Sequence, residues 1–242
     1  MRLLKYTVFF FLSFSCTEDP VSLAPVPDTP VTDIDGNTYQ TVRIGNQVWM
    51  AENLRVTHYN DGTPITLDTA KLTWTFAETE KFCYYANITD PDSIAKFGAL
   101  YNWHTVNTGK LAPTGWHVPT PEEWDVLLNH MIASGYNYDG TTTGNKIGKS
   151  LAAKENWEAS TNTGAVGNDL SQNNTSGFSA YPSGYRTADG HSVDIGKVVT
   201  FWTTVESDKD NAYHRHLNYS NGYLLSGNFF KSEGRCVRCV KD

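Results

Sequence analysis

The stretch PTGWHVPTPEEWDVLLNHM, residues 113–131, carries the clearest local structural signal in the chain. Thr120 is a good N-cap, Pro121 suits the first helical position, and Glu123 completes a capping box three residues after the cap. Four apolar side chains then recur at helical spacing and form one face: Trp124, Leu127, Leu128 and Met131. The sequence therefore predicts a helix that begins at Pro121 and ends near residues 134–135.

The residues around this helix start can be explained without catalysis. Glu122 and Glu123 lie in the first turn, where the helix dipole favours negative charge. His117 follows Trp116 just before the helix, and we expect its ring to form a hydrogen bond with a neighbouring loop. The alternative is a catalytic cluster at His117, Glu122 and Glu123, which requires a third polar group in a solvent-filled cleft.

The composition indicates a folded, loop-rich domain. A chain of 242 residues can bury a sizeable core, and 13% of its residues are aromatic. The formal net charge is −7 and no block of Lys or Arg occurs, so nucleic acid and anionic membrane surfaces are not expected partners.

On both sides of this helix, short β-prone segments dominate the chain. Residues 39–44 and 47–51 flank Gly45-Asn46, which is a good hairpin signal. Residues 97–106 place apolar side chains at helical spacing and predict a second short helix. From Gly177 onward, short β-prone runs alternate with turn residues. Helices are thus expected in only one half, and the predicted class is α+β.

The N-terminus reads as a targeting segment. Arg2 and Lys5 precede an apolar run over residues 6–14, which is too short to span a bilayer comfortably. The following SFSC resembles a bacterial lipobox, which implies lipid on Cys16, and the acids just after it resemble a surface-export signal. We therefore expect a signal peptide over residues 1–16 and an outer-membrane, surface-exposed lipoprotein that meets the membrane only through its lipid anchor. An ordinary signal peptide cut near Cys16 is the alternative.

Residues 17–32, TEDPVSLAPVPDTPVT, contain four prolines. Such a segment favours polyproline II and cannot build a core. We expect it to be a tether, with the folded domain at residues 33–242.

Six stretches together resemble one known family, the Fibrobacter succinogenes major paralogous domain. They are DGNTYQTVRIGNQVWMAENLRV (35–56), GALYNWHTV (98–106), PTGWHVPTPEEW (113–124), GFSAYPSGYR (177–186), FWTTVE (201–206) and VRCVKD (237–242). The family is common on lipoproteins of Bacteroidota and Fibrobacter and has no established activity. Its end motifs resemble formylglycine-generating enzymes, which implies a C-type-lectin-like fold with short helices, a small curled antiparallel sheet and long irregular loops. The paired catalytic cysteines of those enzymes have no counterpart here.

The cysteines depart from the family pattern. Relatives often carry a Cys where this chain has Ala112, just before the Gly-Trp-His segment. The folded part instead contains Cys83, Cys236 and Cys239, and exported proteins usually oxidise nearby thiols. We expect a disulfide from Cys83 to Cys239 or Cys236. Cys236 and Cys239 would point to opposite faces of one strand and are not expected to pair with each other.

No cofactor is expected, but several residues could bind a metal. The weak calcium candidates are loop residues with oxygen ligands: Asp208, Asp210, Asn211 and Asp169. His214 and His216 would share a strand face and could chelate a metal, although packed or exposed strand histidines are commoner. TGNKIGKS, residues 143–150, lacks the first glycine of a phosphate-binding loop.

The aromatic residues suggest where a ligand could bind. The tryptophans in the family motifs are expected to be structural: Trp49, Trp103, Trp116, Trp124 and Trp202. Loop tyrosines are the better candidates for a binding surface: Tyr136, Tyr138, Tyr219 and Tyr223. We expect a non-enzymatic binding or adhesion module for glycan or a cell-surface protein. The alternatives are a polysaccharide-acting enzyme, with two carboxylates in one pocket, or a structural surface protein without a small ligand.

Overall fold

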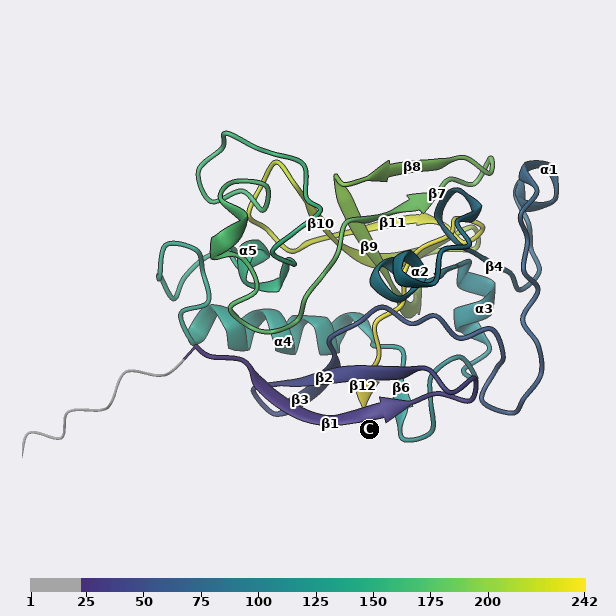
Figure 1. The fold of residues 1–242 in the computed structure, drawn as a ribbon, viewed down its shortest axis with the longest axis horizontal. Helices are drawn as coiled ribbons and strands as arrows, with labels where there is room; N and C mark the ends of the chain where they lie inside the picture. Colours follow the sequence, from purple (N-terminus) through teal and green to yellow (C-terminus); the bar gives the residue numbers. More distant parts are fainter. Residues whose placement is uncertain (1–22) are drawn as a thin grey trace, which may run out of the picture.

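The computed structural model describes residues 23–242, and it contains two five-stranded sheets (Figure 1). The first sheet has the order β1-β2-β3-β12-β6, and all of its neighbours are antiparallel. Its strands are β1 (Val26–Thr32), β2 (Thr38–Ile44), β3 (Gln47–Met50), β12 (Val240–Lys241) and β6 (Trp116–His117). The two ends of the described chain therefore lie in one sheet, on either side of β3.

The second sheet is built almost wholly from the C-terminal part of the chain. Its order is β11-β10-β9-β7-β8, and only the pair β7/β9 is parallel. Its strands are β7 (Ser183–Arg186), β8 (Ser192–Ile195), β9 (Val198–Glu206), β10 (Asn211–Asn218) and β11 (Leu225–Phe230). A two-stranded ladder joins β4 (Phe82–Cys83) to β5 (Leu100–Tyr101).

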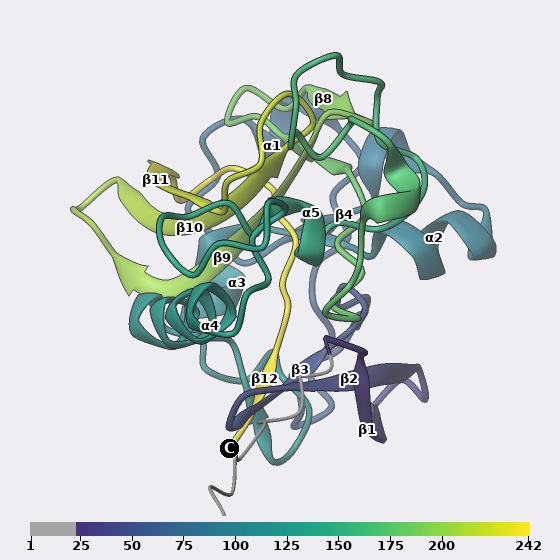
Figure 2. The ribbon, with the colours of Figure 1, turned by 90° about the vertical axis from the view of Figure 1, so that its left-hand side faces the viewer.

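The helices are short except for the one predicted from its cap. α4 (Pro121–Ala133) begins with the expected capping box, in which Thr120 and Glu123 each accept a hydrogen bond from the other's backbone N–H. It lies between the two sheets and contacts β2, β9 and β10 (Figure 2). The others are α1 (Lys71–Trp74), α2 (Pro91–Phe97), α3 (Trp103–Asn107) and α5 (Gly148–Leu151), with 3₁₀ turns at Tyr85–Asn87 and Leu170–Gln172. The predicted α+β class is confirmed.

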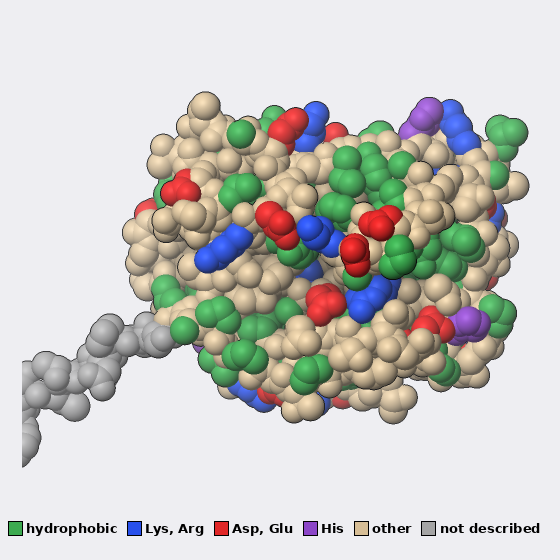
Figure 3. Space-filling model, viewed as in Figure 1, with side chains coloured by type: hydrophobic (Ala, Val, Ile, Leu, Met, Phe, Trp, Pro, Cys, Tyr) green, Lys and Arg blue, Asp and Glu red, His purple; other side chains and the backbone are tan. Residues whose placement is uncertain are grey.

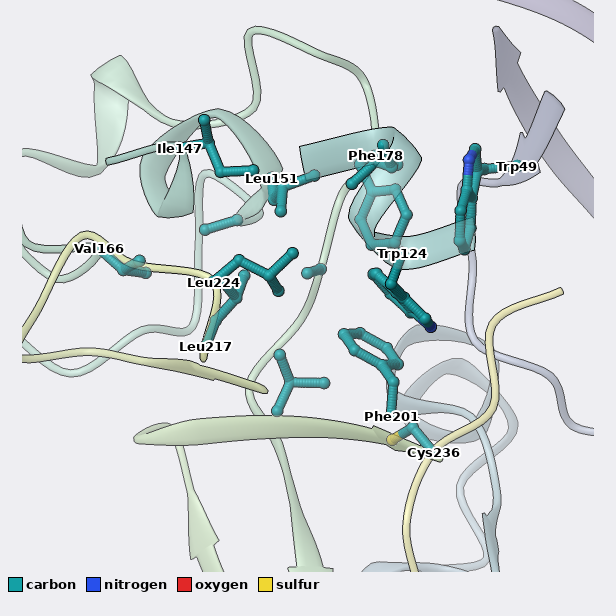
Figure 4. Packing of buried hydrophobic residues seen from close by; sticks show 14 of the residues in the cluster. Trp49, Trp124, Ile147, Leu151, Val166, Phe178, Phe201, Leu217, Leu224 and Cys236 are labelled. Carbon is teal, nitrogen blue, oxygen red and sulfur yellow. The ribbon is translucent and has the colours of Figure 1, made fainter. Parts of the chain in front are cut away.

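Around α4 the core is aromatic. Trp124 packs against Trp49 from β3 and Phe201 from β9, with ring centroids 4.7 and 5.5 Å apart, and Phe178 lies beside all three (Figure 4). A second cluster surrounds Met50, Tyr101 and Trp202. The five tryptophans expected to be structural are all buried.

The predicted hairpin at residues 39–51 is confirmed, and its turn explains the choice of residues. Ile44 pairs with Gln47, and Gly45 adopts φ +60° between them. A Cβ at Gly45 would lie 2.9 Å from the His130 ring of α4, so both the backbone angle and the space favour glycine. The hairpin and the capped helix therefore fit each other directly.

Two local predictions are corrected by the structure. The helix expected over residues 97–106 begins only at Trp103, because Gly98 adopts φ +75° and residues 100–101 pair with β4. The tether expected over residues 17–32 is strand β1 from Val26 onward, paired with β2. β1 is an edge strand, where proline is tolerated because its missing N–H need not join the ladder. The folded domain thus starts before residue 33.

The predictions for the signal peptide, for Cys16 and for the first part of the tether lie outside the described residues. Within residues 23–242, no helix has the length and apolar character needed to cross a membrane.

Candidate functional site

The segment that leads into α4 forms a closed hydrogen-bonded corner. His117 contacts Glu123 through Nε2, at 2.7 Å, and Asp242 through Nδ1, at 2.6 Å. Burial of His117 opposes protonation, but the hydrogen bonds to Asp242 and Glu123 outweigh it and raise the pKa of the imidazole. Both ring nitrogens are thus engaged. As expected, the ring contacts a neighbouring segment of the chain. That segment is the C-terminal one, which contributes Asp242.

Three of the four calcium candidates share one turn, and Asp169 lies in a different loop. The carboxylate of Asp208 accepts hydrogen bonds from the backbone N–H groups of Asp210 and Asn211 in the β9–β10 turn. Asp169 ends the loop of residues 160–169, which we call the 160s loop, and its Oδ1 accepts hydrogen bonds from the backbone N–H and the hydroxyl of Ser171. Within residues 23–242, no three His, Cys, Asp or Glu residues are grouped so that they could hold a metal ion.

Carbonyl oxygens near Asp169 do converge, but on a lysine. The buried Lys149 ammonium donates to the backbone oxygens of Ala165, Asn168 and Asp169. Burial lowers the pKa of Lys149, although the nearby Asp169 opposes that change. The oxygen-rich loop, which the sequence makes a candidate calcium site, is therefore organised around the ammonium group of Lys149.

The structure contains no disulfide among the three cysteines of its described residues. Cys83, Cys236 and Cys239 are buried free thiols. Cys83 and Cys236 belong to the core cluster around Trp124, whereas Cys239 belongs to the cluster around Trp202. The separation of Cys236 from Cys239 follows from the alternation of an extended segment. Burial raises the pKa of Cys83 and of Cys236 to about 11.

The four candidate tyrosines do not form one surface. Tyr136 and Tyr138 line an open cavity of about 420 Å³ next to Lys149. Tyr219 lines a different pocket, which we call the sheet pocket, and the other three tyrosines do not line it. Tyr223 is 47% exposed and lines neither cavity.

The sheet pocket is a cavity of about 200 Å³ on one face of the second sheet. Its floor follows from strand register, since His214 lies opposite Trp202, His216 opposite Thr200 and Asn218 opposite Val198. The lining residues come from all five strands and three adjoining segments: Tyr185, Asp194, Lys197, Val198, Thr200, His214, His216, Asn218, Tyr219, Phe229 and Arg235.

The two histidines stack on each other as strand alternation predicts. Their ring centroids are 5.1 Å apart with an interplanar angle of 24°, and Phe229 packs on His214 at 5.0 Å. Burial, followed by the charge of Arg235, lowers the pKa of His214 to about 2 and of His216 to about 4. Both imidazoles are therefore neutral at pH 7, and each offers one donor and one acceptor.

Arg235 is the buried charge of this site. Its guanidinium lies against three aromatic rings, with Cζ 4.4 Å from the Phe229 centroid, 5.0 Å from Tyr185 and 5.2 Å from Trp202. Its Nη2 donates to the carboxylate of Glu233, which is also buried. Sequence reasoning missed Arg235 and Thr200, because only the fold brings them beside the histidine pair.

Four residues of the sheet pocket carry a buried polar atom without a hydrogen-bond partner. These atoms are Nδ1 of His214, Nδ1 of His216, Oγ1 of Thr200 and Nε of Arg235. Buried polar groups in folded proteins are normally paired, and each unpaired one costs about 1–3 kcal/mol. Four of the nine such atoms among the described residues thus belong to residues that line this one cavity.

The family model for the Fibrobacter succinogenes major domain matches residues 42–241. The chain belongs to this family. The matched region begins in β2 and ends in β12, so it includes α4, the whole sheet pocket and the core cluster around Trp124. It also includes the second core cluster except for Tyr39. No curated protein and no solved structure matches the chain.

Proposed function

We propose that this domain is a non-enzymatic binding module that holds a small polyhydroxylated group, such as a terminal sugar of a glycan, in the sheet pocket. The observation that carries the proposal is the set of four unpaired buried polar atoms around one cavity. A ligand rich in hydroxyl groups would supply the missing partners, because a hydroxyl both donates and accepts.

The walls of the pocket support the same class of ligand. Tyr185, Tyr219 and Phe229 offer aromatic surface, while Asn218 and Thr200 offer polar groups that can fix an orientation. The volume of about 200 Å³ is smaller than the 300–1,000 Å³ of a typical drug-sized site, so one ring is a better fit than an extended chain.

We also propose that the domain is displayed on the outer membrane through lipid on Cys16, with a C-type-lectin-like fold as its scaffold. The basic, apolar and SFSC segments at the N-terminus support an exported lipoprotein. Acidic and basic side chains are interspersed on the face seen in Figure 3, so that face offers no single-sign patch for a polyelectrolyte.

A polysaccharide-acting enzyme is the second candidate, because two open cavities each include two carboxylates. One cavity, of about 430 Å³, is lined by Glu78 and Asp210, and the other by Glu52 and Asp92. The Asp210 side chain is 61% exposed, however, and a general acid usually requires a desolvated carboxyl. We therefore favour binding over hydrolysis. A purely structural surface protein, the third candidate, gives no reason for the unpaired atoms.

The test uses two matched substitutions on the full-length protein. Oγ1 of Thr200 and Oγ of Ser207 are both buried and unpaired, but only Thr200 lines the sheet pocket. Neither Thr200→Val nor Ser207→Ala removes a hydrogen bond of the described residues. Each should therefore change the free energy of unfolding by no more than about 0.5 kcal/mol or stabilise the fold.

On a glycan array, the wild type and Ser207→Ala should bind the same glycans, and Thr200→Val should lose that signal. Thermal unfolding of each variant checks that the fold is intact. Absence of glycan binding by the wild type, or full binding by Thr200→Val, would contradict the proposal.

A further inference from the structure

The charges around the sheet pocket are arranged by depth. Arg235 is 1% exposed, whereas Lys197 and Asp194 lie at the rim on or beside the edge strand β8. Rim charges are screened by solvent, while a charge at the floor acts in a medium of low dielectric. The guanidinium and its partner Glu233 are both buried, so they lie where a charge acts most strongly on a bound group.

Glu233 pairs with Arg235 but leaves donors free. Within residues 23–242, the only side-chain hydrogen bond of Arg235 runs from Nη2 to Glu233. Nε and Nη1 donate to no protein group, and Nη1 is absent from the buried unpaired atoms although Nε is among them. Since the rest of the side chain is enclosed by aromatic rings, Nη1 is the nitrogen available to a group in the pocket.

The positive charge of Arg235 acts on both imidazoles. After burial, it is the largest influence that lowers the pKa of His214 and of His216. Arg235 therefore lies close enough to the histidine pair for one bound group to meet all three side chains.

We infer that the sheet pocket selects a sugar ring that carries a carboxylate, such as a uronate, over its neutral parent. This inference rests on the proposed sugar-binding function. The carboxylate would accept from Nη1 of Arg235 and would gain from Lys197 at the rim, whose Nζ also lies 3.9 Å from Glu158, while the ring hydroxyls meet Thr200 and the neutral imidazoles. Charge-assisted hydrogen bonds are roughly twice as strong as neutral ones, so the carboxylate should govern affinity.

The experiment titrates the full-length protein with D-glucuronate and D-galacturonate, each beside its neutral parent sugar, and with D-glucuronamide. Glucuronamide keeps the shape of the uronate and removes its charge. The readout is the NMR shift of the imidazole Cε1–H signals of His214 and His216, assigned with His214→Gln and His216→Gln. At least one uronate should bind about tenfold or more tightly than its parent sugar and the amide.

Variants separate the two sources of positive charge. Arg235→Gln should abolish the preference, but this residue is buried and the variant could fail to fold. Lys197→Met is safe for folding, because Lys197 is a rim residue 47% exposed in its side chain. It should weaken uronate binding several-fold and leave the neutral sugar unchanged. Lys209→Met, at an exposed lysine outside the pocket, should change neither.

The outcomes are distinguishable. Equal affinity for uronate, parent sugar and amide would overturn the inference and leave the proposed sugar-binding function standing. If no probe shifts either imidazole signal at millimolar concentration while the fold is intact, both the inference and the proposed function fail.

Discussion

Arg238 and Asn53 form a buried pair in which Nε and Nη2 of the guanidinium both donate to the one side-chain oxygen of Asn53, at 3.1 and 2.7 Å. Nη1 donates to the backbone oxygens of Met50 and Phe178, so an arginine with no carboxylate partner is satisfied by amide oxygens. Asn53 in turn donates to Phe97 O and Ser183 Oγ. The pair thereby connects segments that are far apart in the sequence.

Replacing Asn53 by Ala should cost about 3 kcal/mol or more in the free energy of unfolding. The substitution leaves two N–H groups of a fully buried cation without an acceptor, and hydrogen bonds to charged groups are the expensive ones to lose. Urea denaturation of the wild type and the variant gives this difference.

Asn60→Ala is the matched control for that substitution. Asn60 is exposed, and its side chain donates to one backbone oxygen, that of Ala112, at 3.3 Å. It should cost less than about 1 kcal/mol. Equal losses for Asn53→Ala and Asn60→Ala would contradict the view that Arg238 depends on Asn53.

The elements that could be predicted from sequence are those fixed by local chemistry. The capping box at Thr120 and Glu123 satisfies backbone donors within one turn of helix, so its signal is complete in four residues. Gly45-Asn46 closes a two-residue hairpin for the same reason. Side chains two residues apart on a strand point to the same face, so His214 and His216 could likewise be placed side by side from sequence.

The remaining features depend on contacts between distant segments. Strand β1 was not predicted, because its prolines argue against a strand unless it lies at an edge of a sheet, and an edge is a property of the whole sheet. The sheet pocket joins Thr200 and His216 across paired strands and adds Arg235 from beyond β11. No residue spacing in the sequence predicts that these three side chains line one pocket.

Lys149 should stabilise the 160s loop by filling the place a metal ion would otherwise take. Lys149→Met keeps the length and apolar stem of the side chain but removes the ammonium donor from the oxygens of Ala165, Asn168 and Asp169. The oxygens of Ala165 and Asp169 keep backbone donors, whereas that of Asn168 is left without one. We expect a loss of about 1–3 kcal/mol in the free energy of unfolding, measured by urea denaturation. Lys154→Met, at a nearby exposed lysine, should change it by less than about 0.5 kcal/mol. Similar effects of the two substitutions would show that the carbonyl cluster does not need the ammonium.

The stacked histidines should make the domain less stable in mild acid. In the unfolded chain a histidine has a pKa near 6.5, whereas burial lowers the pKa of His214 to about 2 and of His216 to about 4. Below pH 6.5 the unfolded state therefore binds protons that the folded state does not, and stability falls as the pH falls toward the folded pKa values. The slope approaches about 1.4 kcal/mol per pH unit for each histidine.

His117 should oppose this loss, because its protonation in mild acid stabilises the folded state. Burial opposes its protonation, but Asp242 and Glu123 raise its pKa, so its stabilising contribution is full below the unfolded pKa and is lost as the pH rises through the folded one. Urea denaturation at several values between about pH 7 and 5 separates the two effects. His216→Phe should flatten the loss of stability on acidification, and His117→Phe should steepen it. An unchanged slope in His216→Phe would exclude His216 as a source of the acid sensitivity.

The three buried thiols should be unreactive in the native protein and all reactive after unfolding without reductant. Cys83, Cys236 and Cys239 are free and inaccessible, and burial raises the pKa of each thiol, so little thiolate exists at neutral pH. A maleimide label followed by peptide mapping should modify none of them before denaturation and all three afterwards. If a disulfide joined Cys83 to Cys236 or Cys239, only one of the three would be labelled in the unfolded, unreduced chain. That result would mean that the protein acquires a bridge absent from this structure.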